Sequence, residues 1–142
     1  MATEPPLRFF FYGTLIGGGP PAVRQALGKL RDLGPARAAG AVHAIPDPGG
    51  WYPALVAGEG TVAGRLYEAT PDFGEADLAA LDAYEEFDPA DPAGSPYLRV
   101  PIAEGLQAYR FNRPLPPDAR PIPDGDFAAW IGREGLRAFH SP

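Results

Sequence analysis

The chain has 142 residues, of which 45% are hydrophobic and 11% aromatic, and this composition favours a single folded domain over residues 1–142. Its net charge of −6 argues against binding to nucleic acid or to an anionic membrane, because phosphate contacts need clustered lysine and arginine. The absence of cysteine excludes disulfide bonds and thiolate metal sites.

The beginning of the chain carries no recognisable targeting signal. Glu4 precedes only a short apolar run, which is shorter than the apolar core of a signal peptide. No later stretch approaches the length of a membrane-spanning helix. We therefore expect a cytoplasmic protein.

Hydrophobic periodicity and turn residues predict an α+β fold with a mixed sheet. The first half should form a strand at 7–12, a helix at 21–33 and strands at 41–45, 54–57 and 62–69. The second half should form a helix at 75–86, a hairpin of strands 97–103 and 106–112 around a Glu-Gly turn, and a helix at 126–139. No repeat or linker divides the chain.

The first predicted strand ends at Tyr12, Gly13, Thr14 and Leu15. Glycine lets the chain turn tightly, so that successive backbone N–H groups can converge on a carboxylate or on a developing oxyanion. An ordinary glycine turn after a buried strand is the alternative.

The residue inventory offers few candidates for covalent or metal catalysis. Lys29 is the single lysine and falls on a predicted helix, and Ser95 lies in a Pro/Gly loop without a nucleophile-elbow motif. A Ser95–His43 pair remains open as a hydrolase alternative. His43 and His140 lack the spacing of metal ligands, so we expect neither a metal nor a cofactor. An enzyme with this inventory must rely on carboxylates, tyrosines and backbone amides.

Helical geometry singles out one carboxylate. At about 100° per residue, Glu85 lies within about 20° of Leu78 on the apolar stripe, whereas Glu86 is about 80° away and Asp82 about 40° away. A carboxylate on the core-facing side of a helix must be paired, hydrogen-bonded or neutral, and burial raises its pKa toward that of a useful general base. A buried ion pair of Glu85 with Arg99 or with another arginine is the structural alternative.

Three short motifs occur in a fixed order: Tyr-Gly-Thr-Leu at 12–15, Leu-Asp-Ala-Tyr-Glu at 81–85 and Tyr-Leu-Arg at 97–99. In this order and spacing the chain resembles the γ-glutamylcyclotransferase superfamily, in the branch of the AIG2-like proteins and the γ-glutamylamine cyclotransferases. The resemblance covers most of the chain. It implies a small mixed β-barrel flanked by helices and a cofactor-independent enzyme that releases 5-oxoproline from a small γ-glutamyl substrate.

The resemblance also implies roles for individual residues. It places the catalytic glutamate, as general base and then acid, on Glu85. The backbone amides expected to hold the substrate carboxylate or the oxyanion are those of Tyr12, Gly13, Thr14 and Leu15. Tyr97, Arg99 and Phe127 match further pocket positions, with sheet support, an ion pair or core packing as their alternatives.

Two departures from the family pattern bear on the substrate rather than on the fold. Glu86 replaces the glycine that commonly follows the catalytic glutamate, and an acidic, proline-bearing insertion occupies residues 87–96. A non-catalytic small-molecule binding module with the same fold is the alternative function. The sequence does not predict the amine half of the substrate or the oligomeric state.

Overall fold

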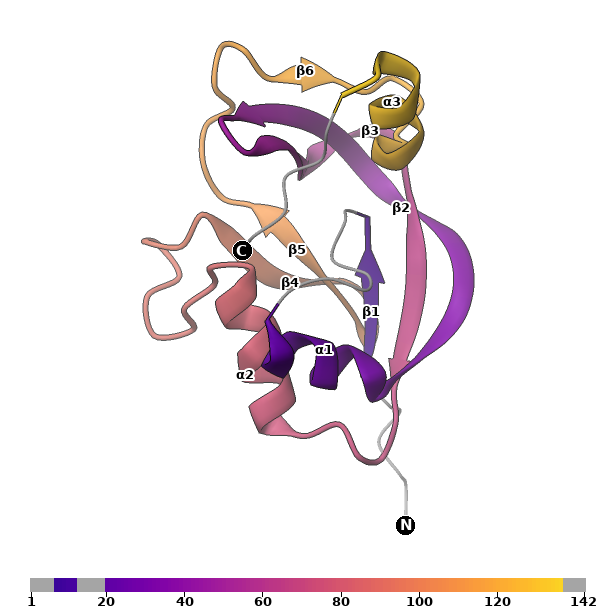
Figure 1. The fold of residues 1–142 in the computed structure, drawn as a ribbon, viewed down its shortest axis with the longest axis vertical. Coiled ribbons are helices and arrows are strands. Elements are labelled where there is room, and N and C mark those ends of the chain that lie inside the picture. The colour runs from indigo at the N-terminus through magenta and orange to yellow at the C-terminus, as the bar shows by residue number, and fades with distance from the viewer. Residues whose placement is uncertain (1–6, 13–19, 137–142) are drawn as a thin grey trace.

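A computed structural model describes residues 7–12 and 20–136, which form six strands and three helices (Figure 1). Along the chain these elements are β1 (Arg8–Phe11), α1 (Pro21–Gly28), β2 (Leu30–Asp47), β3 (Gly50–Ala69), α2 (Glu75–Tyr84), β4 (Tyr97–Ala103), β5 (Leu106–Phe111), β6 (Arg120–Pro121) and α3 (Phe127–Glu134). The predicted α+β class is therefore confirmed. Within the described ranges, no helix has the length and apolar character needed to cross a membrane.

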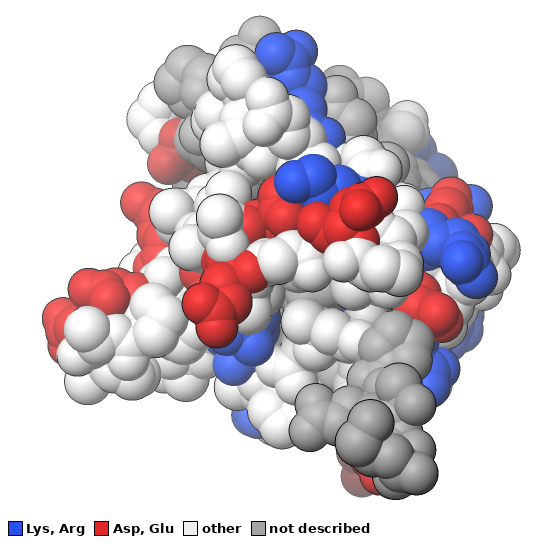
Figure 2. Space-filling view, turned by 90° about the horizontal axis from the view of Figure 1, so that it is seen from below, with Lys and Arg blue, Asp and Glu red and all other residues white. Residues whose placement is uncertain are grey.

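The strands form one mixed sheet in the order β4-β5-β1-β3-β2-β6. β1 and β5 run parallel, and every other neighbouring pair is antiparallel. The sheet curls into a half-barrel (Figure 1), with α1 and α2 side by side at one end and α3 over the opposite end. Seen from the end of α1 and α2, acidic and basic side chains are interspersed on the surface (Figure 2).

The curl depends on bends in the long β2–β3 hairpin. The pairing shifts register between Ala39 and Ala41, and Gly40 between them has a φ of 140°. In the facing part of β3, Gly60 has a φ of 96°. Residues with a side chain rarely adopt a backbone conformation of positive φ. The two glycines therefore allow the hairpin to bend while it stays within the sheet.

β1 contributes to two hydrophobic cores because both of its faces are buried. Phe9 and Phe11 pack with residues of α1 and α2, including Val23 and Leu81. Phe10 and the following Tyr12 pack on the other side with residues of β2, β3 and α3, including Val42, Val62 and Trp130. Burying each aromatic side chain stabilises the fold by about 2–3 kcal/mol, which explains the continuous apolar run in the sequence.

Several predicted boundaries are wrong. The helix predicted at 21–33 ends at Gly28, and the chain enters β2 at Leu30, where it pairs with Ala69. The three strands predicted at 41–45, 54–57 and 62–69 are parts of the continuous strands β2 and β3. The helix predicted at 75–86 ends at Tyr84. The last helix ends at Glu134, before a left-handed Gly135, and residues 137–139 of its predicted range lie outside the described residues.

Candidate active site

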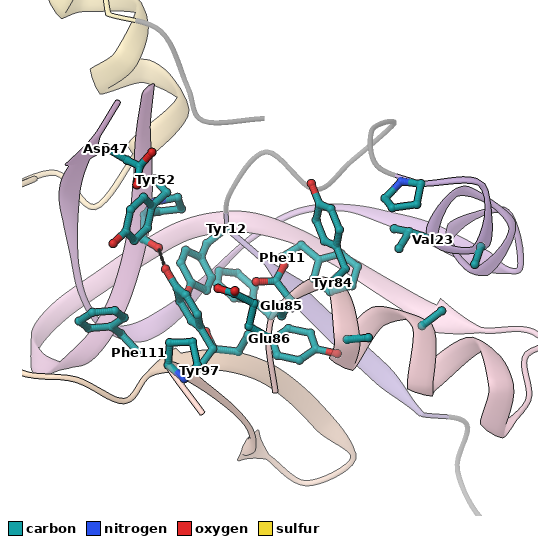
Figure 3. A pocket seen from close by; sticks show the side chains of 18 residues that line it. Phe11, Tyr12, Val23, Asp47, Tyr52, Tyr84, Glu85, Glu86, Tyr97 and Phe111 are labelled. Carbon is teal, nitrogen blue, oxygen red and sulfur yellow. Dashed lines mark hydrogen bonds between the residues drawn. The ribbon is translucent and has the colours of Figure 1, made fainter. Parts of the chain in front are cut away.

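A cavity of about 670 Å³ opens where the ends of β1 and α2 meet the β2–β3 turn and β4 (Figure 3). Its volume suits a small metabolite. Its aromatic and acidic lining residues are Phe10, Phe11, Tyr12, Tyr52, Tyr84, Tyr97, Tyr109, Phe111, Asp47, Glu85 and Glu86. The structure thus brings three of the predicted site residues, Tyr12, Glu85 and Tyr97, to one cavity.

Glu85 lies in the middle of this cavity (Figure 3), immediately after the last residue of α2. Burial raises the pKa of its carboxyl group to about 7, and the neighbouring carboxylate of Glu86 adds to the rise. None of the salt bridges between described residues involves Glu85. A half-buried carboxyl group with this pKa can both accept and donate a proton near neutral pH.

The chain reverses direction directly after Glu85 in a Schellman motif. The N–H of Phe87 donates to the carbonyl of Asp82 at 2.8 Å, and the N–H of Glu86 donates to the carbonyl of Ala83 at 3.1 Å. Glu86 takes a φ of 58°, in the left-handed region that favours glycine. Glycine adopts this conformation without strain, and a side chain in its place costs about 1 kcal/mol.

Asp82 fixes the last turn of α2 to the sheet. Its buried carboxylate accepts from Arg99 Nε at 2.9 Å and from the Tyr109 hydroxyl at 2.7 Å. Arg99 also donates to Gln107 at 3.3 Å. Since Asp82 precedes Glu85 by three residues, these contacts hold the proposed base in place through the helix end. The Glu85–Arg99 pair that the sequence left open does not form, because Arg99 pairs with Asp82 instead.

Three tyrosines in the wall are fixed by hydrogen bonds. The Tyr12 hydroxyl donates to the Tyr109 carbonyl at 2.5 Å and accepts from the Leu55 N–H at 3.2 Å. The Tyr97 hydroxyl donates to the Pro53 carbonyl at 2.8 Å, and Tyr109 donates to Asp82 as described above. Burial raises the pKa of all three phenols, which therefore remain protonated. These three phenols are accordingly held in place and uncharged.

Two predicted site residues do not line the cavity. Arg99 lies on the other side of α2, where it lines a second groove with Asp82. Phe127 is the first residue of α3 and is 1% exposed in the core, where it stacks on Trp130 with ring centroids 6.3 Å apart. Among the predicted backbone donors, Gly13, Thr14 and Leu15 lie outside the described residues.

The Ser95–His43 alternative lacks a hydrogen bond between the two residues in the described structure. The Ser95 hydroxyl accepts from the Asp88 N–H at 2.9 Å and donates to the Asp91 carbonyl at 2.9 Å. These hydrogen bonds stabilise the loop that contains Ser95. His43 Nδ1 is buried and has no hydrogen-bond partner among residues 7–12 and 20–136. The same residues contain no group of three His, Asp or Glu side chains suited to a metal ion.

Local sequence patterns do not indicate Asp47, Tyr109 or the anchoring role of Asp82. Asp82 lay at the margin of the apolar stripe, and only the structure shows that β4 and β5 reach it. Tyr109 belongs to a strand that was correctly predicted, but its contact with Asp82 spans 27 residues of sequence. Asp47 reaches the cavity because the β2–β3 hairpin curls, and no local pattern indicates that curl.

Solved structures with the same fold cover almost the whole chain. The ytfP protein of Escherichia coli is 25% identical, with a TM-score of 0.58 over 90% of this chain and 99% of its own. The uncharacterized protein PH0828 of Pyrococcus horikoshii is 18% identical, with a TM-score of 0.60 over 91% of this chain and 96% of its own. Allophanate hydrolase of Kluyveromyces lactis matches with 15% identity and a TM-score of 0.62, over 91% of this chain but only 21% of its own.

A search of curated protein sequences finds no significant match. A family model described as "Gamma-glutamyl cyclotransferase, AIG2-like" matches residues 9–129, which include all the described residues that line the cavity. The chain therefore belongs to the AIG2-like gamma-glutamyl cyclotransferase family.

Proposed function

We propose that this protein converts a γ-glutamyl amine or peptide to 5-oxoproline and the free amine, with Glu85 as general base and then general acid. The observation that carries the proposal is the half-buried carboxyl group of Glu85, whose pKa is raised to about 7, in the middle of a cavity of metabolite size. Family membership supports the same class of reaction.

The reaction needs no nucleophile from the enzyme, because a γ-glutamyl group carries its own. The α-amine nitrogen attacks the γ-carbonyl carbon, a five-membered ring closes, and the γ-amide C–N bond breaks. Holding the substrate in a folded conformation supplies much of the rate enhancement through proximity. In this scheme Glu85 takes a proton from the α-ammonium group and returns it to the departing amine.

The remaining site residues receive supporting roles in the proposal. The backbone amides of Tyr12, Gly13, Thr14 and Leu15 would hold the substrate carboxylate or the tetrahedral oxyanion, as the family motif implies. Tyr97 would contact the substrate through its ring, since its hydroxyl already donates to Pro53. Arg99 would act indirectly, by fixing the end of α2 through Asp82.

Mass-spectrometric detection of 5-oxoproline after incubation with a panel of γ-glutamyl compounds tests this function. We expect Glu85→Gln to lower kcat by about 10²–10⁴-fold, because the amide is nearly isosteric but cannot carry the proton. Glu86→Gln is the matched control and should retain turnover. An active Glu85→Gln protein beside an inactive Glu86→Gln protein would reject the assignment. Calorimetric binding of 5-oxoproline by a parent protein without turnover would indicate a binding module instead.

A further inference from the structure

The charged side chains among the described residues that line the cavity are all acidic. Its described lining includes the carboxylates of Asp47, Glu85 and Glu86, and none of the described lining residues is lysine, arginine or histidine. An amine half that bears a carboxylate, as an amino acid or peptide does, would meet no positively charged side chain there. Repulsion by these carboxylates would oppose its binding.

The carboxylates occupy two different parts of the cavity (Figure 3). Glu85 and Glu86 lie in the middle, and Asp47 lies beside Tyr52 at one end. In the proposed reaction the α-ammonium group of the substrate must reach Glu85 to give up its proton. Asp47 is therefore available to interact with another part of the substrate, and the amine half is the part that remains.

The end of the cavity around Asp47 suits a cation in a further way. Half-buried Tyr52 presents an aromatic ring there, and aromatic rings attract ammonium groups. Burial raises the pKa of Tyr52, and the nearby carboxylates of Asp47, Glu86 and Asp118 add to the rise, so negative charge lies close to this ring. Asp47 is exposed in the β2–β3 turn, where one of its carboxylate oxygens accepts from the Gly49 N–H at 3.0 Å and is held in position.

We infer that the preferred substrate is a γ-glutamyl amide whose amine half carries a second, positively charged amino group and no carboxylate. This inference rests on the proposed function and specifies its substrate class. The γ-glutamyl part is a zwitterion with no net charge, so the second ammonium group provides the net positive charge that the acidic cavity favours. It would lie against Asp47 and Tyr52, with Glu86 adding to the attraction from the middle of the cavity.

Three substrates that differ only in terminal charge test the inference. They are the γ-glutamyl amides of 1,5-diaminopentane (cationic), hexylamine (neutral) and 6-aminohexanoate (anionic), with kcat/KM measured from 5-oxoproline release at low salt. We expect the cationic amide to exceed the neutral one by about tenfold, and the anionic amide to be slower still, by about another tenfold. The neutral chain is the more hydrophobic one, so a preference for the cation cannot come from apolar burial.

Matched variants locate the effect. Asp47→Asn should lower the ratio of cationic to neutral kcat/KM several-fold. Glu104→Gln removes the same charge from the exposed tip of the β4–β5 hairpin, outside the cavity, and should leave the ratio unchanged. An equal fall of the ratio in both variants would mean that the overall charge of −6, and not the cavity, selects the substrate, and would overturn the inference.

Failure of the inference and failure of the proposed function give different results. Release of 5-oxoproline from all three amides at equal or reversed rates would overturn the charge preference and leave the reaction in place. If no amide releases 5-oxoproline, the reaction is wrong, and calorimetric titration of the same three amides then decides the charge preference alone. Tighter binding of the cationic amide would support the inference as a statement about the ligand, and equal or weaker binding would overturn it.

Discussion

The raised pKa of Glu85 makes a prediction about stability that does not depend on any substrate. In the unfolded chain the carboxyl group titrates near its ordinary value of 4.5, and in the folded protein near 7. Between these values the folded state keeps a proton that the unfolded state has lost. The contribution of Glu85 to the free energy of unfolding therefore falls as the pH rises from about 4.5 to about 7, and it is constant outside that window.

The size of the effect follows from the same two values. Each pH unit within the window costs about 1.4 kcal/mol, so an ionised Glu85 destabilises the fold at pH 8 by about 3 kcal/mol relative to its protonated form. Glu85→Gln removes the titrating group and leaves a neutral side chain of similar shape. We expect this variant to match the parent near pH 4.5 and to exceed its free energy of unfolding by about 3 kcal/mol at pH 8.

Urea unfolding of parent and variant at pH 4.5, 6 and 8, followed by circular dichroism, measures this difference. Other acidic residues titrate in both proteins, so only the difference between parent and variant is interpreted. Glu104→Gln, at an exposed site, is the control and should differ from the parent by less than about 0.5 kcal/mol at every pH. If the difference in free energy of unfolding between Glu85→Gln and the parent stayed constant between pH 4.5 and 8, the carboxyl group would not be desolvated. A larger stabilisation by Glu85→Gln at pH 4.5 than at pH 8 would contradict the predicted sign.

Two further predictions concern the end of α2. Glu86→Gly should raise the free energy of unfolding by about 1 kcal/mol, because glycine adopts the φ of 58° without strain. Thermal or urea unfolding measures this gain. Glu86→Gln keeps the strain and serves as the control. Both variants remove the carboxylate that helps to raise the pKa of Glu85. The rising limb of the pH profile of 5-oxoproline release should therefore move to lower pH. An unchanged limb would show that Glu86 does not affect the pKa of Glu85. Asp82→Asn should lower the free energy of unfolding, measured in urea, by about 3 kcal/mol, because it leaves the Arg99 guanidinium without its buried partner. A loss below about 1 kcal/mol would show that this ion pair does not anchor α2.

Local sequence signals predicted β1, β4 and β5 well, because a continuous apolar run and a Glu-Gly hairpin turn specify them without distant partners. The helix predicted at 21–33 extends beyond the observed end of α1 because burial and backbone conformation are separate properties. Leu30 has the helical spacing of Val23 and Leu27, and it does pack against the same core, but it does so as the first residue of β2. Periodicity thus predicted its burial and not its backbone conformation, which depends on pairing with β3.

The site shows the same division between local and distant information. The angle of Glu85 on the helix was enough to predict that it faces inward, since that depends only on residues of α2. The charges near Glu85 depend on which carboxylate pairs with Arg99, which is distant in the sequence. In the structure Arg99 pairs with Asp82, with 2.9 Å between Arg99 Nε and Asp82 Oδ1. An arginine beside Glu85 would have lowered its pKa, so pairing Arg99 with Asp82 is what allows burial to raise the pKa of Glu85 to about 7. The Leu-Asp-x-x-Glu motif thus carries two carboxylates with separate tasks: Asp82 binds the cation and holds the helix end, while Glu85 stays without an ion pair in the described structure and can exchange a proton near neutral pH.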